Sequence, residues 1–222
     1  MSDVLLLAAG GLARETLSSI RQAGTDRVTG ILDDAATLHG STIGGVPVLG
    51  GTALAAERPE RLLLCAGSGA TRLAMAARLA ALGVGPGRYA THLHPSVAVG
   101  ERCGIGPGSI LLAGSVLTCD VRVGRHVVLM PRTVLTHDDE LDDGVTCAAG
   151  VTLAGRVSVG ARAYLGMQAS VRQGLRVGAD AVLGMGAVAL RDVPDGAVWV
   201  GNPAAPLPSR VRADRADRAG VA

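Results

Sequence analysis

Residues 153–178 read LAGRVSVGARAYLGMQASVRQGLRVG, and this stretch repeats a pattern every six residues. An apolar residue opens each hexad, and the frame runs in both directions from Val99 to Ala189 without a slip. An α-helix has a period of 3.6 and a strand a period of 2, so neither explains six. At this hydrophobic content, chance would give such a run on the order of once in 10⁵ sequences. The sixteen positions are Val99, Ile105, Leu111, Leu117, Val123, Leu129, Leu135, Leu141, Cys147, Leu153, Val159, Leu165, Val171, Val177, Leu183 and Ala189.

A period of six predicts a triangular parallel β-helix, in which each hexad supplies one short strand and one corner. The apolar residue points into the prism, and the fifth residue of the hexad is small or Val because the corner is narrow. Gly follows the apolar residue at seven positions, where we expect it to relieve the backbone at a turn. Three hexads form one coil, so residues 99–188 predict five coils stacked at about the 4.8 Å spacing of strands.

The composition agrees with such a prism and excludes several classes of function. Hydrophobic residues make up 48% of the 222 residues, but aromatics only 1%, with no Phe. A surface that stacks single-stranded nucleic acid lacks its rings. With 21 basic and 19 acidic residues, the chain has no basic stripe for nucleic acid or anionic lipid. We therefore expect no nucleic-acid partner.

No apolar run reaches the length of a membrane span, so we expect no membrane insertion. The first residues carry no basic segment of the kind that opens a signal peptide. Four cysteines lie far apart without a CxxC pair, and we read them as free thiols in a reducing cytoplasm: Cys65, Cys103, Cys119 and Cys147. The predicted location is cytoplasmic.

Before residue 92, short apolar runs alternate with Gly turns and amphipathic stretches. This order predicts parallel strands joined by crossover helices in a small Rossmann-like α/β domain. Such sheets bind ligands beyond the carboxyl ends of their strands. The predicted strands are 4–8, 28–32 and 61–65, and the predicted helices are 13–23 and 70–82. The predicted domains are 1–92 (Rossmann-like), 93–205 (β-helix) and 206–222 (a polar tail).

The whole chain resembles the sialic acid O-acetyltransferase / PglD-like sugar acyltransferase family. The resemblance is carried by LLLAAGGLARE, ILDD, LLLCAGSG, HLHPSVAVG, LTHDDELDDGVTCAAGVTLAG, VLGMGAVALRDVP and VGNPA, which together span residues 4–205. It implies a left-handed β-helix, a homotrimer and acetyl-CoA as co-substrate. It also implies a nucleotide-sugar acceptor, whose amino or hydroxyl group takes the acetyl group.

The resemblance places a general base at His137, with Asp138 as the acid that orients it. A His with a pKa near neutrality can take the proton from an attacking amine or hydroxyl. A neighbouring carboxylate can hold the ring and stabilise the imidazolium. Other acids in the same segment, Asp139 among them, remain alternative partners. No covalent intermediate and no metal are expected.

The remaining site residues also follow from the resemblance. The backbone N–H of Gly155 would stabilise the developing oxyanion. The family often has a second His nine residues after the base, and Thr146 stands there. The other expected coenzyme contacts are Ala149, Met167 and Met185, and the turn Gly201–Ala204 lies either near the adenine or only at the exit of the last coil.

In the N-terminal domain the resemblance assigns the nucleotide-sugar to the ends of the strands. The family's glycine pattern is incomplete, because Ala8 and Ala13 replace two glycines and Leu12 replaces a His. Asp33 either binds a uracil or ribose edge or caps a turn. The expected substrate-binding residues are Gly10, Gly11, Leu12, Asp33, Asp34 and Gly67.

The predicted function is therefore N-acetylation of a nucleotide-linked amino sugar, with acetyl-CoA as donor and His137 as base. One alternative is O-acetylation of a sialic acid or other glycan hydroxyl. A second is a non-catalytic β-solenoid scaffold. A γ-type carbonic anhydrase would need three His around zinc, and the array supplies only His126 and His137 at an unsuitable spacing.

Overall fold

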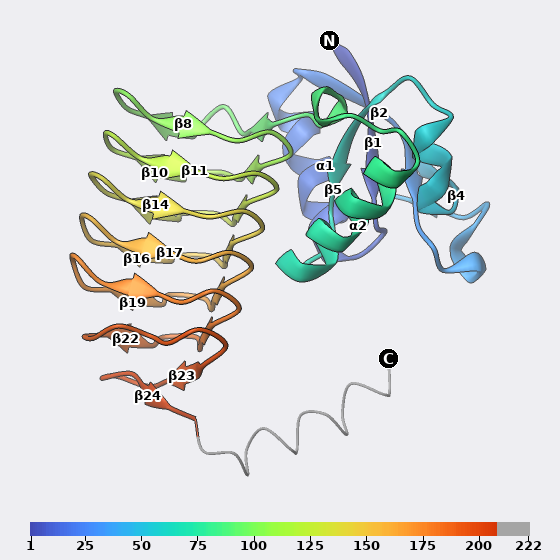
Figure 1. Ribbon diagram of the computed structural model, residues 1–222. Helices are drawn as coiled ribbons and strands as arrows, with labels where there is room; N and C mark the ends of the chain where they lie inside the picture. The colour runs from blue at the N-terminus through green and yellow to red at the C-terminus, as the bar shows by residue number, and fades with distance from the viewer. Residues whose placement is uncertain (208–222) are drawn as a thin grey trace.

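The computed structural model describes residues 1–207, and it consists of an N-terminal α/β region beside a stack of triangular coils (Figure 1). Within these residues no helix is long and apolar enough to cross a membrane. The predicted tail lies outside the described residues from 208 onward, whereas Pro206 belongs to a short strand.

The N-terminal region is built on a five-stranded sheet in the order β3-β4-β2-β1-β5. Strands β1, β2, β4 and β5 are parallel, and only β3 runs antiparallel, to β4. The strands are β1 (Ser2–Leu7), β2 (Asp26–Leu32), β3 (Thr42–Ile43), β4 (Val46–Gly50) and β5 (Arg61–Leu64). The three predicted strands are present, with their bounds shifted by one or two residues, but the β3–β4 hairpin was not predicted.

Two helices cover opposite faces of this sheet, since alternate residues of β1 belong to different cores. Val4 and Leu6 pack with α1 (Gly11–Ala23), whereas Leu5 and Leu7 pack with α2 (Gly69–Ala81). Both helices were predicted to within two residues. Three 3-10 turns complete the region: η1 (Ala36–Leu38), η2 (Thr52–Ala56) and η3 (Pro86–Arg88).

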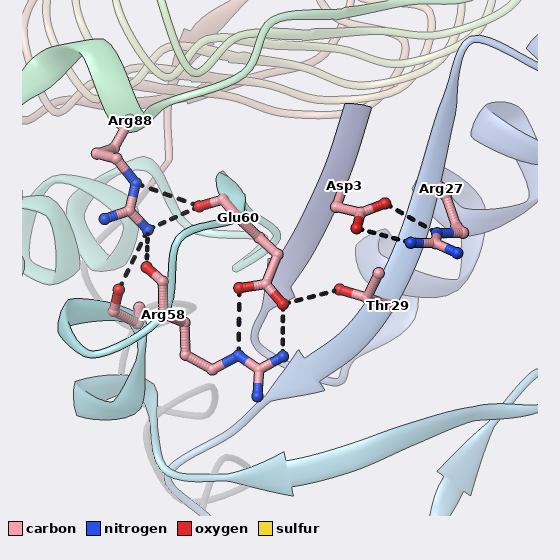
Figure 2. A network of polar contacts seen from close by, with 7 residues as sticks. Asp3, Arg27, Thr29, Arg58, Glu60 and Arg88 are labelled. Atoms are coloured by element: carbon pink, nitrogen blue, oxygen red, sulfur yellow. Dashed lines mark hydrogen bonds and ion pairs between the residues drawn. The ribbon is translucent and has the colours of Figure 1, made fainter. Parts of the chain in front are cut away.

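A polar network fixes the segment that leads into β5. Figure 2 shows the carboxylate of Glu60 accepting hydrogen bonds from Arg58 and, at 3.3 Å, from the Thr29 hydroxyl of β2. Arg88 donates to the backbone carbonyls of Arg58 and Glu60 at 2.6 and 2.7 Å. Glu60 is only 9% exposed, and its pKa is lowered, chiefly by the hydrogen bond from Arg58. This network ties η3 to the edge of the sheet.

The second region is a parallel β-helix with three ladders of two-residue strands. One ladder holds β22-β19-β16-β13-β10-β7, the second β20-β17-β14-β11-β8, and the third β23-β21-β18-β15-β12-β9-β6, with β24 added antiparallel. The array therefore exceeds the predicted five coils, because one ladder stacks six strands. This arrangement is the parallel β-helix that the six-residue period predicts. The strands are β6 (His92–Leu93), β7 (Ala98–Val99), β8 (Gly104–Ile105), β9 (Ile110–Leu111), β10 (Val116–Leu117), β11 (Arg122–Val123), β12 (Val128–Leu129), β13 (Val134–Leu135), β14 (Glu140–Leu141), β15 (Thr146–Cys147), β16 (Thr152–Leu153), β17 (Ser158–Val159), β18 (Tyr164–Leu165), β19 (Ser170–Val171), β20 (Arg176–Val177), β21 (Val182–Leu183), β22 (Val188–Ala189), β23 (Val198–Val200) and β24 (Ala205–Pro206).

The hexad positions form the core of the prism as predicted. Fourteen of the sixteen opening residues are buried, from Leu111 to Ala189. Val99 is 42% exposed and Ile105 is only partly buried, because both belong to the coil that opens the stack. Burial at the six-residue spacing is thus the main packing principle of this region, and it fails only at the open end.

The role predicted for the glycines that follow the opening residues is wrong. Their backbone conformation lies outside the left-handed region; that region is used two residues later in each hexad, for instance by Arg132 and Asp138. Glycine is needed at these positions because a neighbouring coil leaves no space for a Cβ atom. A Cβ at Gly106 would stand 2.5 Å from the carbonyl of Gly124, and one at Gly166 would stand 2.6 Å from the Met185 nitrogen. The close approach of the next coil therefore explains the Gly pattern.

The last coil closes the prism with the chain's single Trp. Trp199 in β23 is 6% exposed and belongs to the prism core, and the guanidinium carbon of Arg191 lies 5.0 Å from its ring centroid. The turn from Gly201 to Ala204 then reverses the chain into β24, and the Ala204 N–H donates to the Val188 carbonyl. This turn ends the last coil, as one of its two predicted roles requires.

The two regions share one apolar core. Ile110, Leu112 and Val128, on the outer face of the ladder that starts with β6, pack into the same cluster as α1. At the junction the buried His92 imidazole Nε2 lies 2.7 Å from the Ser19 hydroxyl of α1. His92 itself pairs with Ile110 in the ladder, so the β-helix begins one residue before the predicted boundary at 93.

Candidate active site

His137 and Asp138 lie in the turn that follows β13, at one corner of the prism. His137 Nδ1 is 2.8 Å from Asp138 Oδ2, and both side chains are about half exposed. Because an ionised carboxylate only accepts, this contact places a proton on Nδ1 and leaves Nε2 as the ring's acceptor. The pair therefore has the geometry of an oriented base with an accessible lone pair.

Asp139, the next acid along the chain, faces the prism instead. It occupies a fifth hexad position, where the array predicts a small residue, and it is completely buried. Its carboxylate accepts from the N–H groups of Thr136, at 2.8 Å, and Val157, at 2.9 Å. Burial raises the pKa of Asp139 to about 6 against the effect of these two donors. Asp139 thus fixes the turn that carries His137.

Two other acids of this segment have partners elsewhere, and Asp142 is exposed. Glu140 lies 3.4 Å from Arg122 on the next face, and Asp143 is 2.6 Å from Arg125 at the next corner. Within residues 1–207, Asp138 is therefore the acid that contacts the His137 ring.

Gly155 lies directly below His137, one coil further along the chain. A Cβ at this residue would stand 2.8 Å from His137 Cδ2 and closer still to Nε2, so the imidazole ring lies against the Gly155 Cα. The Arg156 N–H donates to the His137 carbonyl at 2.9 Å, whereas the Gly155 N–H makes no hydrogen bond in the described part of the chain. A free backbone donor thus lies beside the predicted base.

A groove of about 770 Å³ lies at the preceding corner and extends over the outer face of β13 and β16. It collects three of the predicted coenzyme contacts, whereas Gly155 lies at the far end of the same face, next to His137. The groove is lined by Gly114, Pro131, Arg132, Val134, Ala149, Gly150, Thr152, Met167, Gln168, Met185 and Gly186.

The prediction that Thr146 contacts the coenzyme does not fit the structure. Thr146 is 5% exposed and lies on the face covered by the N-terminal region, away from the groove. Its hydroxyl accepts a hydrogen bond from Arg72 Nη2 at 2.9 Å and donates to the Gly67 carbonyl at 3.4 Å. Packing by α2 has taken this position out of reach of a ligand.

The Gly turn of the N-terminal region lies, as expected, between the end of β1 and the start of α1. Gly10 and Gly11 are exposed, but the Leu12 side chain is 9% exposed and belongs to the core under α1. The Leu12 side chain thus packs in the core, and a substrate contact at this residue would have to use its backbone. A groove of about 830 Å³ follows α1 from Gly11, and its lining includes two arginines that were not predicted, Arg14 and Arg21.

Both aspartates after β2 hold backbone turns. Asp33 accepts from the Ala9 N–H at 2.7 Å and the Ala35 N–H at 2.8 Å. Asp34 Oδ1 accepts from the N–H and hydroxyl of Thr52 at the start of η2, and these bonds lower its pKa. Of the two roles considered for Asp33, turn capping is the one that these contacts favour. The Gly67 carbonyl accepts from Arg72 at 3.1 Å.

The described residues contain no group of three His, Cys, Asp or Glu side chains that could hold a metal ion. His126 lies at a different corner from His137, with its ring edge-on to Tyr89 at 4.6 Å. Burial lowers the pKa of His126 to about 4. All four cysteines are unpaired, in agreement with the predicted free thiols.

No protein-family model matches the chain. It is similar to GDP-perosamine N-acetyltransferase of Escherichia coli O157:H7, at 29% identity over 90% of this chain and 93% of that protein. A crystal structure of PerB from Caulobacter crescentus with CoA and GDP-perosamine has a TM-score of 0.84 at 30% identity, covering 94% of this chain and 98% of the other.

The acetyltransferase domain of PglB from Neisseria gonorrhoeae FA1090, in complex with acetyl coenzyme A, also has a TM-score of 0.84, at 28% identity over 93% of this chain and 99% of that chain. A shorter match of 85 residues reaches 35% identity with the acyl-[acyl-carrier-protein]–UDP-N-acetylglucosamine O-acyltransferase of Thiobacillus denitrificans. The match spans 33% of that protein's length.

Proposed function

The chain belongs to the hexapeptide-repeat sugar acetyltransferases, and from this premise we propose that it transfers the acetyl group of acetyl-CoA to the amino group of a nucleotide-linked amino sugar. The observation that carries the proposal is the His137–Asp138 pair with the free Gly155 N–H beside its ring. We also propose that it belongs to the sialic acid O-acetyltransferase / PglD-like branch, because motifs such as ILDD and LTHDDELDDGVTCAAGVTLAG resemble that branch.

The proposed reaction is a direct transfer. The sugar amine attacks the thioester carbonyl carbon while His137 Nε2 removes a proton from its nitrogen. The imidazolium that forms is stabilised by Asp138, which keeps its own negative charge. The Gly155 N–H donates to the oxygen as it becomes negative. The carbon–sulfur bond then breaks, and the proton passes from His137 to the coenzyme sulfur.

We propose that residues 1–91 form a Rossmann-like domain that binds the nucleotide-sugar at the carboxyl ends of its strands. Gly10, Gly11 and Gly67 are exposed there and offer backbone groups. Asp33 and Asp34 would act mainly by holding the turns around the acceptor, since their oxygens already accept hydrogen bonds. The cytoplasm, where acetyl-CoA and nucleotide sugars occur, is the proposed location.

A homotrimer is proposed as the working form. The groove with Ala149, Met167 and Met185 and the corner with His137 lie at opposite edges of one face. Packing this face against a second copy would bring the groove of one chain to the His137 corner of the next. Exposed apolar side chains in the groove, such as Met185 at 70% exposure, support a covered face.

The test is thiol release from acetyl-CoA in the presence of GDP-, UDP- and dTDP-linked amino sugars. We expect turnover with one of them and its loss in His137→Ala. His94→Ala is the control, since His94 contacts Ser96 of the first coil and Gln22 of α1. A His137→Ala protein that acetylates at the wild-type rate would overturn the mechanism.

Hydroxyl acceptors form a second arm of this assay, because part of the chain matches O-acyltransferases. Faster turnover with a glycan hydroxyl than with every amino sugar would replace N-acetylation by O-acetylation. Absence of saturable acetyl-CoA binding by calorimetry would leave a scaffold function.

A further inference from the structure

Five arginines of the β-helix each pair with an acid about one coil away. Arg102 forms a two-point contact with Asp120 at 2.6 and 2.7 Å, and Arg162 does the same with Asp180. In both pairs, each partner is the third residue after the opening position of its hexad. The two partners are eighteen residues apart in the sequence. The further pairs are Arg122 with Glu140, Arg125 with Asp143 and Arg176 with Asp195.

Arg132 occupies the same position in its hexad but has no acid partner in the described residues, and Arg156, at the same hexad position, has none either. One coil above Arg132 stands Gly114, and one coil below stands Gly150. The Arg132 guanidinium makes no ion pair or hydrogen bond within residues 1–207. A Cβ at Gly114 would stand 3.5 Å from Arg132 Cγ, so the missing side chain leaves room for the arginine along the corner.

Arg132 is also the single charged side chain among the residues that line the 770 Å³ groove. The rest of the lining is glycine, apolar or neutral, and it includes Ala149, Met167 and Met185. A long, mostly apolar groove with one unneutralised cation suits a ligand with a flexible neutral arm and an anionic group. Guanidinium groups bind phosphate through two parallel hydrogen bonds.

We infer that Arg132 binds a phosphate group of a substrate in this groove, an inference that rests on the proposed acetyl transfer. Two substrates carry such a group: the coenzyme, on its phosphorylated arm and ribose, and the nucleotide-sugar, on its diphosphate. The contact would serve binding rather than bond breaking, because the phosphates take no part in the attack on the thioester.

The test is the steady-state kinetics of Arg132→Met, which keeps the length of the side chain and removes its charge. Loss of a charge-assisted contact should raise the KM of one substrate on the order of 10- to 100-fold, with kcat within about twofold. Arg132→Lys should retain part of the binding. Arg122→Met is the matched control. Arg122 is exposed on another face of the prism, outside the groove, and lies 3.4 Å from Glu140.

Shortened forms of the acetyl donor would show which phosphate group Arg132 contacts. With acetyl-CoA, acetyl-3′-dephospho-CoA and acetyl-pantetheine, the difference between wild type and Arg132→Met should vanish once the contacted phosphate is missing. A rise confined to the KM of the acceptor would assign the contact to the nucleotide diphosphate. Both outcomes support the inference.

Calorimetry measures the binding of CoA and of the acceptor's nucleoside diphosphate to wild type and to Arg132→Met. This test of the phosphate contact does not depend on turnover. If wild type is inactive toward every acceptor, the proposed function fails, and weaker binding of either ligand by Arg132→Met would still support the phosphate contact. Equal KM values and equal binding in a folded Arg132→Met protein would overturn the inference while leaving the role of His137 intact.

Discussion

The imidazole of His137 lies against the backbone of Gly155, so that a Cβ at residue 155 would stand 2.8 Å from His137 Cδ2. The base and the proposed oxyanion donor are thus in contact across neighbouring coils. Gly155 has a backbone conformation that any L-residue can adopt, and only the ring above it requires glycine.

The first prediction is that Gly155→Ala lowers kcat about 10²- to 10³-fold, because the new methyl group pushes the imidazole away from the substrate and from the free N–H. Steady-state kinetics with a thermal melt would measure this. Gly87→Ala, where a Cβ meets nothing within 4 Å, is the control. A folded Gly155→Ala protein with wild-type kcat would disprove the contact's importance.

Asp138→Asn should lower kcat/KM by about 10- to 10³-fold, because it removes the charge that stabilises the imidazolium while keeping a side chain of the same shape. Asp142→Asn, in the same acidic segment but exposed, should remain within about twofold of wild type. Equal losses in both variants would mean that the segment acts through its summed charge and not through the 2.8 Å contact.

Thr146→Val should leave the KM of acetyl-CoA within about twofold, since the hydroxyl contacts Arg72 and not the groove. Its cost should appear in unfolding by urea, at about 1–2 kcal/mol for a lost buried hydrogen bond. A large rise in the KM would restore Thr146 to the coenzyme site.

Arg72→Met should destabilise the protein more strongly than Thr146→Val. The completely buried guanidinium donates to the carbonyls of His126, Gly144 and Val145, and those of His126 and Gly144 would be left without a donor. We expect a loss of about 3–5 kcal/mol in the free energy of unfolding. A loss below about 1 kcal/mol would show that water replaces Arg72 at this junction.

Asp139 predicts a pH dependence of stability. Its folded-state pKa of about 6 lies above its ordinary value of 3.8, so the folded protein binds this proton more tightly than the unfolded chain. The contribution is present below about pH 4 and is lost as the pH rises through 6. Unfolding by urea at pH 5 and pH 7.5 should therefore show Asp139→Asn gaining about 1–2 kcal/mol relative to wild type at the higher pH.

The buried histidines predict the opposite slope. Burial lowers the pKa of both His92 and His126 from 6.5 to about 4. The folded state binds these protons less tightly, so their contribution is present above about pH 6.5 and is lost as the pH falls toward 4. His92→Gln should flatten the fall in unfolding free energy between pH 6.5 and 4.5. An unchanged slope would contradict burial of a neutral His92.

Much of the β-helix could be predicted because its packing repeats along the chain. A period of six places Leu135 and Leu153 in one interior row, and the same spacing places Gly155 under His137. Even the isolation of Arg132 is visible in the sequence, since the residues eighteen positions before and after it are glycines. Local periodicity determines these features because each coil contacts mainly the coils next to it.

The sequence by itself thus determined the solenoid, its aliphatic interior and the His137–Asp138 pair. Only the tertiary structure decided what depends on contacts between distant segments. Arg72, 74 residues earlier, donates to the Thr146 hydroxyl, and Asp33 holds the turn at Ala9 across 24 residues. The reason for glycine at Gly106 is the backbone of a neighbouring coil, which no single hexad reveals. Such contacts follow from how the sheet and the prism pack together, and no short-range pattern encodes them.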